Sequence, residues 1–563
     1  MNSTTTPSRS LAVYEVLAHD IKEMGVSCVF GLMSDDTAAF AVTLDAIGVE
    51  FIGARHENNA ISMAEGYAAA TGGFAVAVVG RGPATANGLH AAVYALRSGS
   101  PVMIIYGEAA VNPPNNAVGP DYKAFDARAV LEAAGIPVFC PATAMSAQSA
   151  LHDAAACAMT GKATALLLPV DIQPVEIVPA PSRPPAPYQH APKPASTASI
   201  EVAAGVLARS QRPLIIAGRG AYHAGARSGL ECLAERTGAL LATTARGKEM
   251  FDGSPYNLGI VGSFSTSVAR RYIEQADCVV VFGASLNLFT TSWGMSIPKV
   301  PVIQVDNSRS NIGRWLNADV AVVGDALEVA ERLADLAAPR KAADKPFHDA
   351  SVLGQIAEFE LTDDFQPART ARTMDPRELG LALSELLPQQ RSVIYDAGHF
   401  LGVVPYIKVP DPAHFKFTSD FASIGIGFGA ALGFAKARPD ETTVLVIGDG
   451  GLMMTLSELE TAAREGLPLV VVVMNDCAYG AELHVLRPHQ LPVEKSLFPD
   501  IEFADVAACF GFETAAIRSL EDLDGIAPAL RNPEGPILLD CKINQEVVAP
   551  FMAELAAAEA AED

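Results

Sequence analysis

The chain has 563 residues, of which 50% are hydrophobic and 18% are charged, and its formal net charge is −24 at pH 7. This length suggests roughly three to four domains, each with enough apolar residues for a core of its own. A surface this acidic argues against general binding to nucleic acids or to anionic membranes. It does not exclude an anionic small molecule, because a metal ion and backbone amides can hold phosphates locally.

Cysteine usage and the first residues bear on the cellular compartment. The 8 cysteines form no CxxC pair, and several lie in apolar, strand-like runs, which favours buried reduced thiols. The first ten residues are polar and lack the apolar segment of a signal peptide, and no apolar run reaches the length of a membrane span. We therefore expect a soluble, cytoplasmic protein.

Strands and helices alternate along the first third of the chain. Apolar runs predict strands at residues 27–31, 49–54, 74–79 and 101–106, and helical periodicity is clearest over 11–24 and from Asn58 to the glycines at 72–73. Alternation of this kind predicts a parallel sheet covered by helices. We assign residues 1–183 to this N-terminal domain, and the proline-rich segment 179–195 to an exposed linker.

Two further blocks repeat the pattern. Strands are predicted at 213–217, 240–243, 277–282 and 300–305 in a middle domain, residues 196–345, and at 392–395, 444–447, 469–474 and 536–540 in a C-terminal domain, residues 370–550. The Ala/Glu-rich residues 551–563 read as a surface helix. The expected fold class is α/β, with three consecutive parallel-sheet domains.

The segment from Val444 to Gly480 concentrates the chemistry. Asp449 lies in a Gly-Asp-Gly-Gly turn directly after one predicted strand, a helix is expected from about residue 456 to 464, and Asp476 follows the next strand. Both carboxylates are therefore expected at the sheet edge where α/β proteins bind ligands. Glycines let a diphosphate approach the backbone, and two carboxylates can hold the Mg²⁺ that bridges it. A plain strand–helix–strand unit with an ordinary turn is the alternative.

The same segment resembles the thiamin diphosphate motif, in which Gly-Asp-Gly is followed about two dozen residues later by Asn-Asn or Asn-Asp. Residues 451–474 separate Gly450 from Asn475, which is 24 positions. With the three-block layout, the chain is similar to the superfamily of thiamin-diphosphate-dependent decarboxylases, acetolactate synthases and benzaldehyde lyase. The resemblance implies pyrimidine-binding, middle and diphosphate-binding domains, and a metal held by Asp449, Asp476 and the main-chain carbonyl of Ala478. Many relatives have Asn at the position of Asp476.

The resemblance also implies which residues touch the cofactor. Glu57 matches the glutamate that hydrogen-bonds to the aminopyrimidine ring and activates it. The alternative is a solvated Glu at a helix N-terminus, where the helix dipole favours it. Ile424 matches the apolar residue that keeps the cofactor bent. The full set of expected cofactor-binding residues is Glu57, Gly398, His399, Ile424, Gly448, Asp449, Gly450, Gly451, Asp476, Ala478, Tyr479 and Gly480.

The substrate side is less well defined by the sequence. Asp35 and Glu482 occupy the positions of two active-site acids of pyruvate decarboxylases, and His484 joins them as a candidate for moving protons. Helix capping is the alternative for Asp35 and a solvated helix face for Glu482. The adjacent pair of histidines of those decarboxylases is missing: Asn115-Asn116 is the nearest match, and a segment around Glu482 resembles benzaldehyde lyase instead.

The sequence therefore predicts an enzyme that uses thiamin diphosphate and Mg²⁺ to cleave, and in some cases form, the carbon–carbon bond next to a carbonyl. Its substrate would be a 2-oxo acid or a 2-hydroxy ketone. An acetolactate synthase with FAD in the middle domain and a non-catalytic nucleotide-binding protein are the alternatives. The turn at Gly218-Arg219-Gly220 is a weak nucleotide signal, so FAD is possible but not favoured. The resemblance implies a homodimer or homotetramer with active sites between subunits, and neither nucleic acid nor membrane as a partner.

Overall fold

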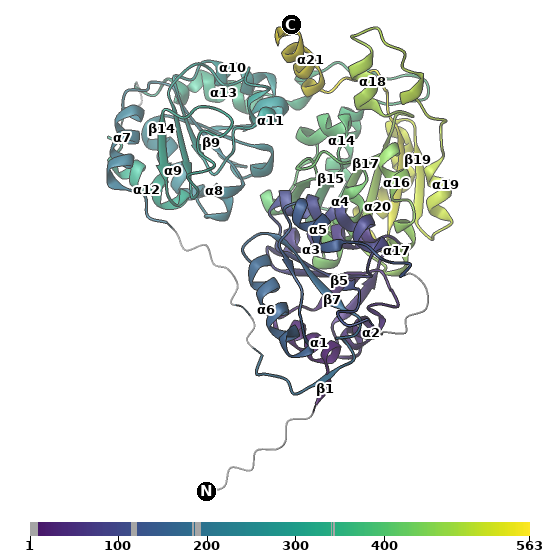
Figure 1. The fold of residues 1–563 in the computed structure, drawn as a ribbon. Helices are drawn as coiled ribbons and strands as arrows, with labels where there is room; N and C mark the ends of the chain where they lie inside the picture. Colours follow the sequence, from purple (N-terminus) through teal and green to yellow (C-terminus); the bar gives the residue numbers. More distant parts are fainter. Residues whose placement is uncertain are drawn as a thin grey trace.

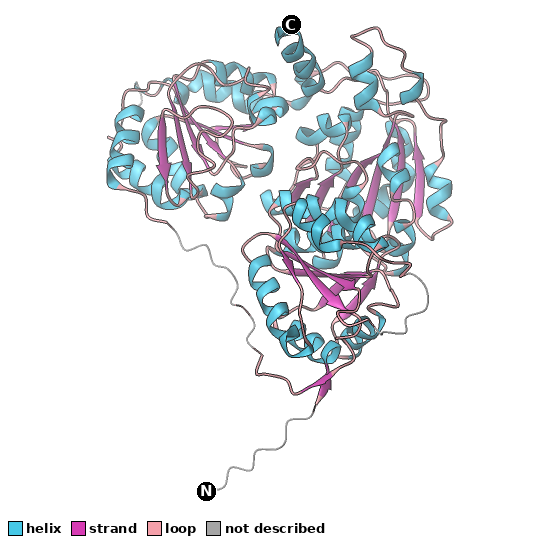
Figure 2. Ribbon diagram, in the orientation of Figure 1, coloured by secondary structure: helices cyan, strands magenta, loops and turns pink. Residues whose placement is uncertain are grey.

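The computed structural model describes residues 10–113, 121–182, 185, 193–338, 340–341 and 344–562. Three six-stranded sheets organise the chain, each covered by helices (Figures 1 and 2). In Figure 1 the N-terminal domain lies at the bottom, the middle domain at the left and the C-terminal domain at the right. The predicted α/β class with three parallel-sheet domains is confirmed, and the predicted ranges 1–183, 196–345 and 370–550 each enclose one sheet.

The N-terminal sheet has the strand order β3-β2-β4-β5-β7-β6, with all neighbours parallel. Its strands are β2 (Cys28–Gly31), β3 (Glu50–Gly53), β4 (Ala75–Val79), β5 (Val102–Glu108), β6 (Val138–Phe139) and β7 (Ala163–Pro169). Its helices are α1 (Val13–Glu23), α2 (Ala38–Ala46), α3 (Glu57–Thr71), α4 (Pro83–Ser98), α5 (Ala127–Ala133) and α6 (Ala147–Ala158). A short antiparallel pair, β1 (Leu11–Ala12) and β8 (Glu176–Ile177), ties the two ends of the domain together.

The middle sheet runs β11-β10-β9-β12-β13-β14, the strand order of dinucleotide-binding folds. Its strands are β9 (Pro213–Ala217), β10 (Leu240–Thr243), β11 (Asn257–Ile260), β12 (Cys278–Phe282), β13 (Val302–Asp306) and β14 (Val320–Val323). Its helices are α7 (Thr197–Leu207), α8 (Arg219–His223), α9 (Arg227–Thr237), α10 (Ser267–Glu274), α11 (Leu288–Thr291) and α12 (Ala326–Leu336), and α13 (Ala350–Glu358) follows. The continuous apolar runs β9 and β10 have their predicted bounds, and β12 and β13 differ from theirs by one or two residues at an end, whereas β11 and β14 were not predicted.

The C-terminal sheet, β16-β15-β17-β18-β20-β19, repeats the strand order of the N-terminal sheet. Its strands are β15 (Arg391–Tyr395), β16 (Phe415–Phe417), β17 (Thr442–Gly448), β18 (Leu469–Asn475), β19 (Glu513–Ile517) and β20 (Ile537–Lys542). Its helices are α14 (Pro376–Leu386), α15 (Ile426–Ala437), α16 (Asp449–Met454), α17 (Glu458–Arg464), α18 (Gly480–Leu486), α19 (Phe503–Ala508), α20 (Leu523–Arg531) and α21 (Pro550–Glu562). A 3-10 helix, η7 (His399–Tyr406), follows β15.

Helices α3 and α15 join the N-terminal and C-terminal domains. Both are rich in Ala and Gly, and their apolar residues belong to one shared core that continues into both sheets. A side chain added at Gly66 or Gly429 would run into atoms of the opposite helix. The small residues therefore let the two backbones approach closely, and this contact fixes the start of α3 beside the start of α15. Among the described residues, no helix is long and apolar enough to cross a membrane.

Candidate active site

Three aspartates collect at one edge of the C-terminal sheet. Asp396 follows β15, Asp449 starts α16 directly after β17, and Asp476 follows β18. These three strands are neighbours in the sheet. The strand order reverses between β15 and β17, and such a switch point is where open α/β sheets bind ligands. The prediction that Asp449 and Asp476 share this edge is therefore supported by the topology.

Asp449 and Asp476 form a buried pair of like charges. Each residue is 5% exposed, and the Asp476 Oδ2 atom has no hydrogen-bond partner. Burial raises the pKa of Asp449 to about 7, and burial together with the charge of Asp449 raises the pKa of Asp476 to about 8. Two buried carboxylates and an unsatisfied oxygen fit a divalent cation, which removes the repulsion and supplies the missing partner.

The number of ligands fits Mg²⁺ bound together with a phosphate. The described residues hold no cluster of three or more His, Cys, Asp or Glu side chains placed to bind a metal. Mg²⁺ typically takes one or two carboxylates and fills its remaining positions with phosphate oxygens and water. The predicted ligands Asp449, Asp476 and the Ala478 carbonyl would be the protein's share. The side chain of the neighbouring Asn475 is engaged elsewhere: its Nδ2 donates to Asp540 (2.9 Å) and to the Ile501 carbonyl (3.2 Å), and its Oδ1 accepts from the Cys477 amide (3.3 Å).

The backbone around the pair lies in a helical turn and is packed closely by neighbouring side chains. The predicted turn at Gly448–Gly451 is in fact the first turn of α16, whose first residue is Asp449, and a second helix, α17, follows. The Gly450 amide donates to Asp449 Oδ1 (2.8 Å), and a side chain at Gly450 would meet the Tyr479 ring at 2.8 Å. Cys477 has a φ of 58°, a left-handed conformation that is strained for a non-glycine residue. This strained residue lies between Asp476 and Ala478, the two predicted metal ligands of this segment.

His399 and His484 border the aspartate pair. His399 Nε2 lies 3.5 Å from Asp476 Oδ2, and the two imidazole rings meet edge to face with centroids 5.1 Å apart. Burial, and secondarily His484, lowers the pKa of His399 to about 3, so its ring is neutral and can donate one N–H. A side chain at Gly480 would collide with the His399 ring, and Gly398 precedes η7 at the same edge. The loop predicted to touch a diphosphate therefore lies beside the metal candidates.

Asp396 is a supporting residue that the sequence reasoning left without a role. It is fully buried and accepts hydrogen bonds from the amides of Gly425 (2.6 Å) and Gly427 (2.9 Å). Burial raises its pKa to about 6, against the lowering effect of those amide bonds. Asp396 thus anchors the start of α15, immediately after the half-buried Ile424. An aspartate directly after a buried strand, like Asp449 and Asp476, was the signal that could have identified it.

Glu57 starts α3 and is half-buried. Its carboxylate accepts a hydrogen bond from Asn87 Nδ2 on α4 (3.1 Å). One turn further along α4, His90 bonds to Ser423, the residue before Ile424. The structure therefore brings the Glu57 end of α3, the start of α4 and the Ile424 loop to one place.

Glu458 is a second supporting residue without a predicted role. This fully buried carboxylate, on α17, accepts from the Arg55 amide (2.9 Å) and from Asn59 Nδ2 (3.0 Å), and so ties the approach to Glu57 to the C-terminal domain.

The two acids proposed for the substrate side are less enclosed. Asp35 has a side chain 79% exposed and pairs with Lys123, whereas the neighbouring Asp36 is buried and accepts from Arg81 Nε (2.9 Å) and Lys123 Nζ (2.7 Å). Glu482 is exposed on α18, and His484 on the same helix is buried with an unpaired Nε2. Asn115 and Asn116 lie outside the described residues.

The contrast between Asp35 and Asp36 gives a stability prediction. Burial raises the pKa of Asp36, but hydrogen bonds from Lys123 and Arg81 outweigh it and hold that pKa below its ordinary value of 3.8. Its contribution to stability is therefore complete above about pH 4 and is lost as the pH falls through the folded-state pKa. We expect Asp36→Asn to lower the free energy of unfolding by about 2 kcal/mol at pH 7, because it leaves two cations without their buried partner.

Urea unfolding of Asp36→Asn at pH 7 and pH 3 measures this effect, with Asp35→Asn as the matched control, expected within about 0.5 kcal/mol of the parent. The difference between Asp36→Asn and the parent should shrink at the lower pH. Equal losses for the two variants would contradict the account.

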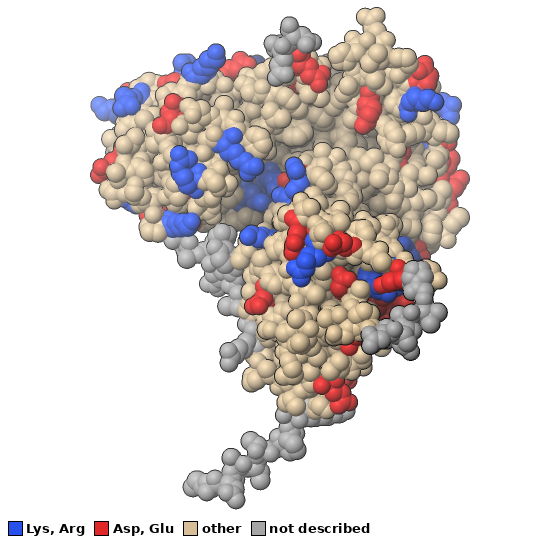
Figure 3. All heavy atoms as spheres, in the orientation of Figure 1, with Lys and Arg blue, Asp and Glu red and all other residues tan. Residues whose placement is uncertain are grey.

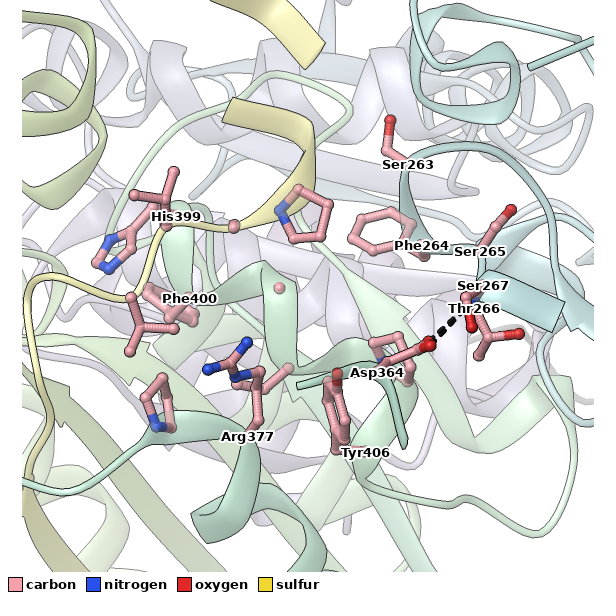
Figure 4. A pocket seen from close by; sticks show the side chains of 18 of the residues that line it. Ser263, Phe264, Ser265, Thr266, Ser267, Asp364, Arg377, His399, Phe400 and Tyr406 are labelled. Carbon is pink, nitrogen blue, oxygen red and sulfur yellow. Dashed lines mark hydrogen bonds between the residues drawn. The ribbon is translucent and has the colours of Figure 1, made fainter. Parts of the chain in front are cut away.

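A cavity of about 230 Å³ opens behind His399, between the C-terminal and middle domains. Figure 4 shows His399 and Phe400 on one side and the middle-domain segment Ser263–Ser267 on the other, with Arg377 and Tyr406 between them. Arg377 is neutralised by the buried Asp375 (2.6 Å), so the cavity offers mainly apolar walls and hydroxyl groups. Its volume is below the about 300–1,000 Å³ of typical small-molecule pockets.

The middle-domain glycines are explained by packing. The Gly220 amide donates to the Gly283 carbonyl (3.0 Å), and side chains at Gly218 or Gly220 would collide with the loop after β12. The turn at Gly218-Arg219-Gly220 thus brings two strand ends together, which leaves no separate argument for a flavin.

Comparison with known proteins agrees with this geometry. Three family models match the chain in order: the N-terminal TPP binding domain (residues 11–117), the central domain (200–333) and the C-terminal TPP binding domain (396–541) of thiamine pyrophosphate enzymes. The chain is 26% identical to the acetolactate synthase isozyme 2 large subunit of Escherichia coli K12, over 94% of this chain and 95% of that protein.

Two further relatives extend the comparison. The chain is 27% identical to the sulfoacetaldehyde acetyltransferase of Alcaligenes xylosoxydans, over 90% and 88% of the two chains. An X-ray structure from Mycobacterium smegmatis, assigned as a thiamin diphosphate-dependent enzyme, superposes with a TM-score of 0.74 at 22% identity, covering 95% of this chain and 99% of that one. The three family models together span most of the protein, and the chain belongs to the thiamine pyrophosphate enzyme family.

Proposed function

We propose that the chain cleaves, and with a second carbonyl compound forms, the carbon–carbon bond next to a carbonyl, in a 2-oxo acid or a 2-hydroxy ketone. When bound, thiamin diphosphate supplies the carbanion chemistry that this bond cleavage requires. The observation that carries the proposal is the buried Asp449–Asp476 pair, with its unsatisfied oxygen, at the sheet edge where His399 packs against the Gly480 backbone.

The protein's own residues have separate roles in this proposal. Asp449, Asp476 and the Ala478 carbonyl would hold Mg²⁺. The diphosphate would lie among Gly398, His399, Gly448, Gly450, Gly451, Tyr479 and Gly480. Glu57 holds a proton at the aminopyrimidine ring, oriented by Asn87 (3.1 Å). Ile424 would contact the rings of the bound cofactor.

Proton transfer to and from the substrate is assigned to Asp35, Glu482 and His484. His484 is the best placed of the three in the described chain, because it is buried against His399 and has a free ring nitrogen. Asp35 and Glu482 are exposed, which fits acids that become enclosed when a second subunit covers the site.

We propose a homodimer or homotetramer with its active sites between subunits. Large apolar side chains are exposed around the site: Phe421 (36%), Met453 (49%), Met454 (61%) and Tyr479 (40%). Exposed apolar side chains grouped in this way are typical of a protein–protein contact. Light scattering of the purified chain tests the assembly: a monomer at micromolar concentration would contradict it.

Acetolactate synthase is the second candidate, favoured by the names of several relatives. The test is a panel of 2-oxo acids, acyloins and sulfoacetaldehyde, incubated with the protein, thiamin diphosphate and Mg²⁺. Release of carbon dioxide or aldehyde without formation of acetolactate supports the leading proposal. Acetolactate as the main product, from a protein with flavin absorbance, would replace it with an FAD-dependent synthase. No turnover of any member would favour the non-catalytic nucleotide-binding alternative.

A further inference from the structure

The loop Thr418–Gly425, which joins β16 to α15 and carries Ile424, is held by residues of the two other domains. Asp420 forms an ion pair with Arg246 of the middle domain and accepts from Ser98 Oγ of the N-terminal domain (3.2 Å). The Asp420 side chain is 21% exposed. A single carboxylate thus joins all three domains four residues before Ile424.

Neighbouring residues of the loop are anchored as well. Arg97 Nε donates to the Asp420 carbonyl (2.7 Å), and the Arg97 guanidinium lies over the Phe421 ring, 5.2 Å from its centroid. Ser423 bonds to His90. Figure 3 shows Lys and Arg side chains gathered in the hollow between the middle domain and the other two, which is unusual on a chain with a net charge of −24.

The anchors surround a strained residue. Ala422 has a φ of 51°, a left-handed conformation that is unfavourable for a non-glycine residue. Such strain persists where the surroundings fix the backbone on both sides. The contacts of Asp420 and Ser423 do this, and they set the direction in which the chain reaches Ile424. Burial raises the pKa of Asp420, but the charges of Arg246 and Lys416 outweigh it and keep the carboxyl ionised.

We propose that Asp420 is a positioning residue: by binding Arg246 and Ser98 it fixes the loop Thr418–Gly425 and thereby orients Ile424 against the rings of thiamin diphosphate. The inference rests on the proposed function, because it assumes that the cofactor binds beside Ile424. It goes beyond that function because it gives the middle domain a role: Arg246 of that domain helps to set how the cofactor is held.

The experiment measures cofactor binding by the full-length chain. In Asp420→Asn the amide retains one acceptor oxygen but loses the charge that holds Arg246. We expect thiamin diphosphate, titrated calorimetrically with Mg²⁺, to bind about tenfold more weakly, the effect of losing a hydrogen bond between charged groups. The near-ultraviolet circular dichroism of the bound cofactor at saturation should also change, because its rings are held at a different angle.

Controls separate this role from general stability. Asp411→Asn removes a carboxylate before β16, at the other end of that strand, and should leave both readouts unchanged. Arg246→Lys should restore part of the affinity that Arg246→Met loses, and the Arg246 variants replace Asp420→Asn if that variant does not fold. If the parent binds the cofactor and the variants bind it with unchanged affinity and spectrum, the positioning role is overturned. If the parent does not bind it, the proposed function itself fails.

Discussion

Replacing Glu57 with Gln is expected to lower turnover by about 10²–10⁴-fold, the usual contribution of a positioned proton-transfer group. Gln has the same size and can still bond to Asn87, which now donates to Glu57 Oε2 at 3.1 Å. It cannot hold the negative charge or exchange the proton that the aminopyrimidine requires. The measurement is kcat for the substrate identified in the panel, with thiamin diphosphate and Mg²⁺ at saturation.

A matched control is Glu132→Gln on α5, a solvated glutamate of the same domain that pairs with Arg128. It should retain full activity, and both variants should unfold at the same urea concentration as the parent. Turnover by Glu57→Gln equal to that of the parent would remove Glu57 from the proposed mechanism.

Asp449→Asn is expected to act in opposite directions on stability and on cofactor binding. Without a cation, the substitution removes one of two buried like charges, so the free energy of unfolding at pH 8 should rise by about 1–2 kcal/mol. Mg²⁺-dependent binding of thiamin diphosphate should weaken by more than about 100-fold. Substituting a residue that only hydrogen-bonds to a metal ligand typically costs about 10–100-fold in metal affinity, and changing the ligand itself costs more. Urea unfolding and calorimetry measure the two effects.

Asp476→Asn provides the comparison, because many relatives have Asn at this position, so an amide oxygen there is compatible with a metal site. We expect the same direction of change in stability but only about tenfold weaker cofactor binding. The account would be contradicted if Asp449→Asn destabilised the cation-free chain, since that would mean the two carboxylates do not repel each other.

The strands and the metal candidates could be predicted because they depend on local sequence. β9 and β10 have exactly their predicted bounds, since each is an apolar run between polar or glycine residues. Asp449 and Asp476 follow such runs directly, so parallel strands must bring them to one edge. The edge strands β6 and β16, with 2 and 3 residues, are too short to give a periodic signal.

The supporting contacts could not be predicted, because they join distant parts of the chain. Asp36 rather than Asp35 is the enclosed carboxylate only because Arg81 and Lys123 arrive from loops 45 and 87 residues away. Asp420 meets Arg246 across 174 residues. The glycines around Asp449 predicted a turn, but burial of this segment against the sheet makes them the start of α16.

The most direct test of the central claim is a calorimetric titration of the purified chain with thiamin diphosphate, in Mg²⁺ and again in excess chelator. The account predicts one binding site per chain in the presence of Mg²⁺ and none in chelator, because the diphosphate cannot approach two buried carboxylates without the cation between them. Equal binding in both buffers, or no binding in either, would contradict it.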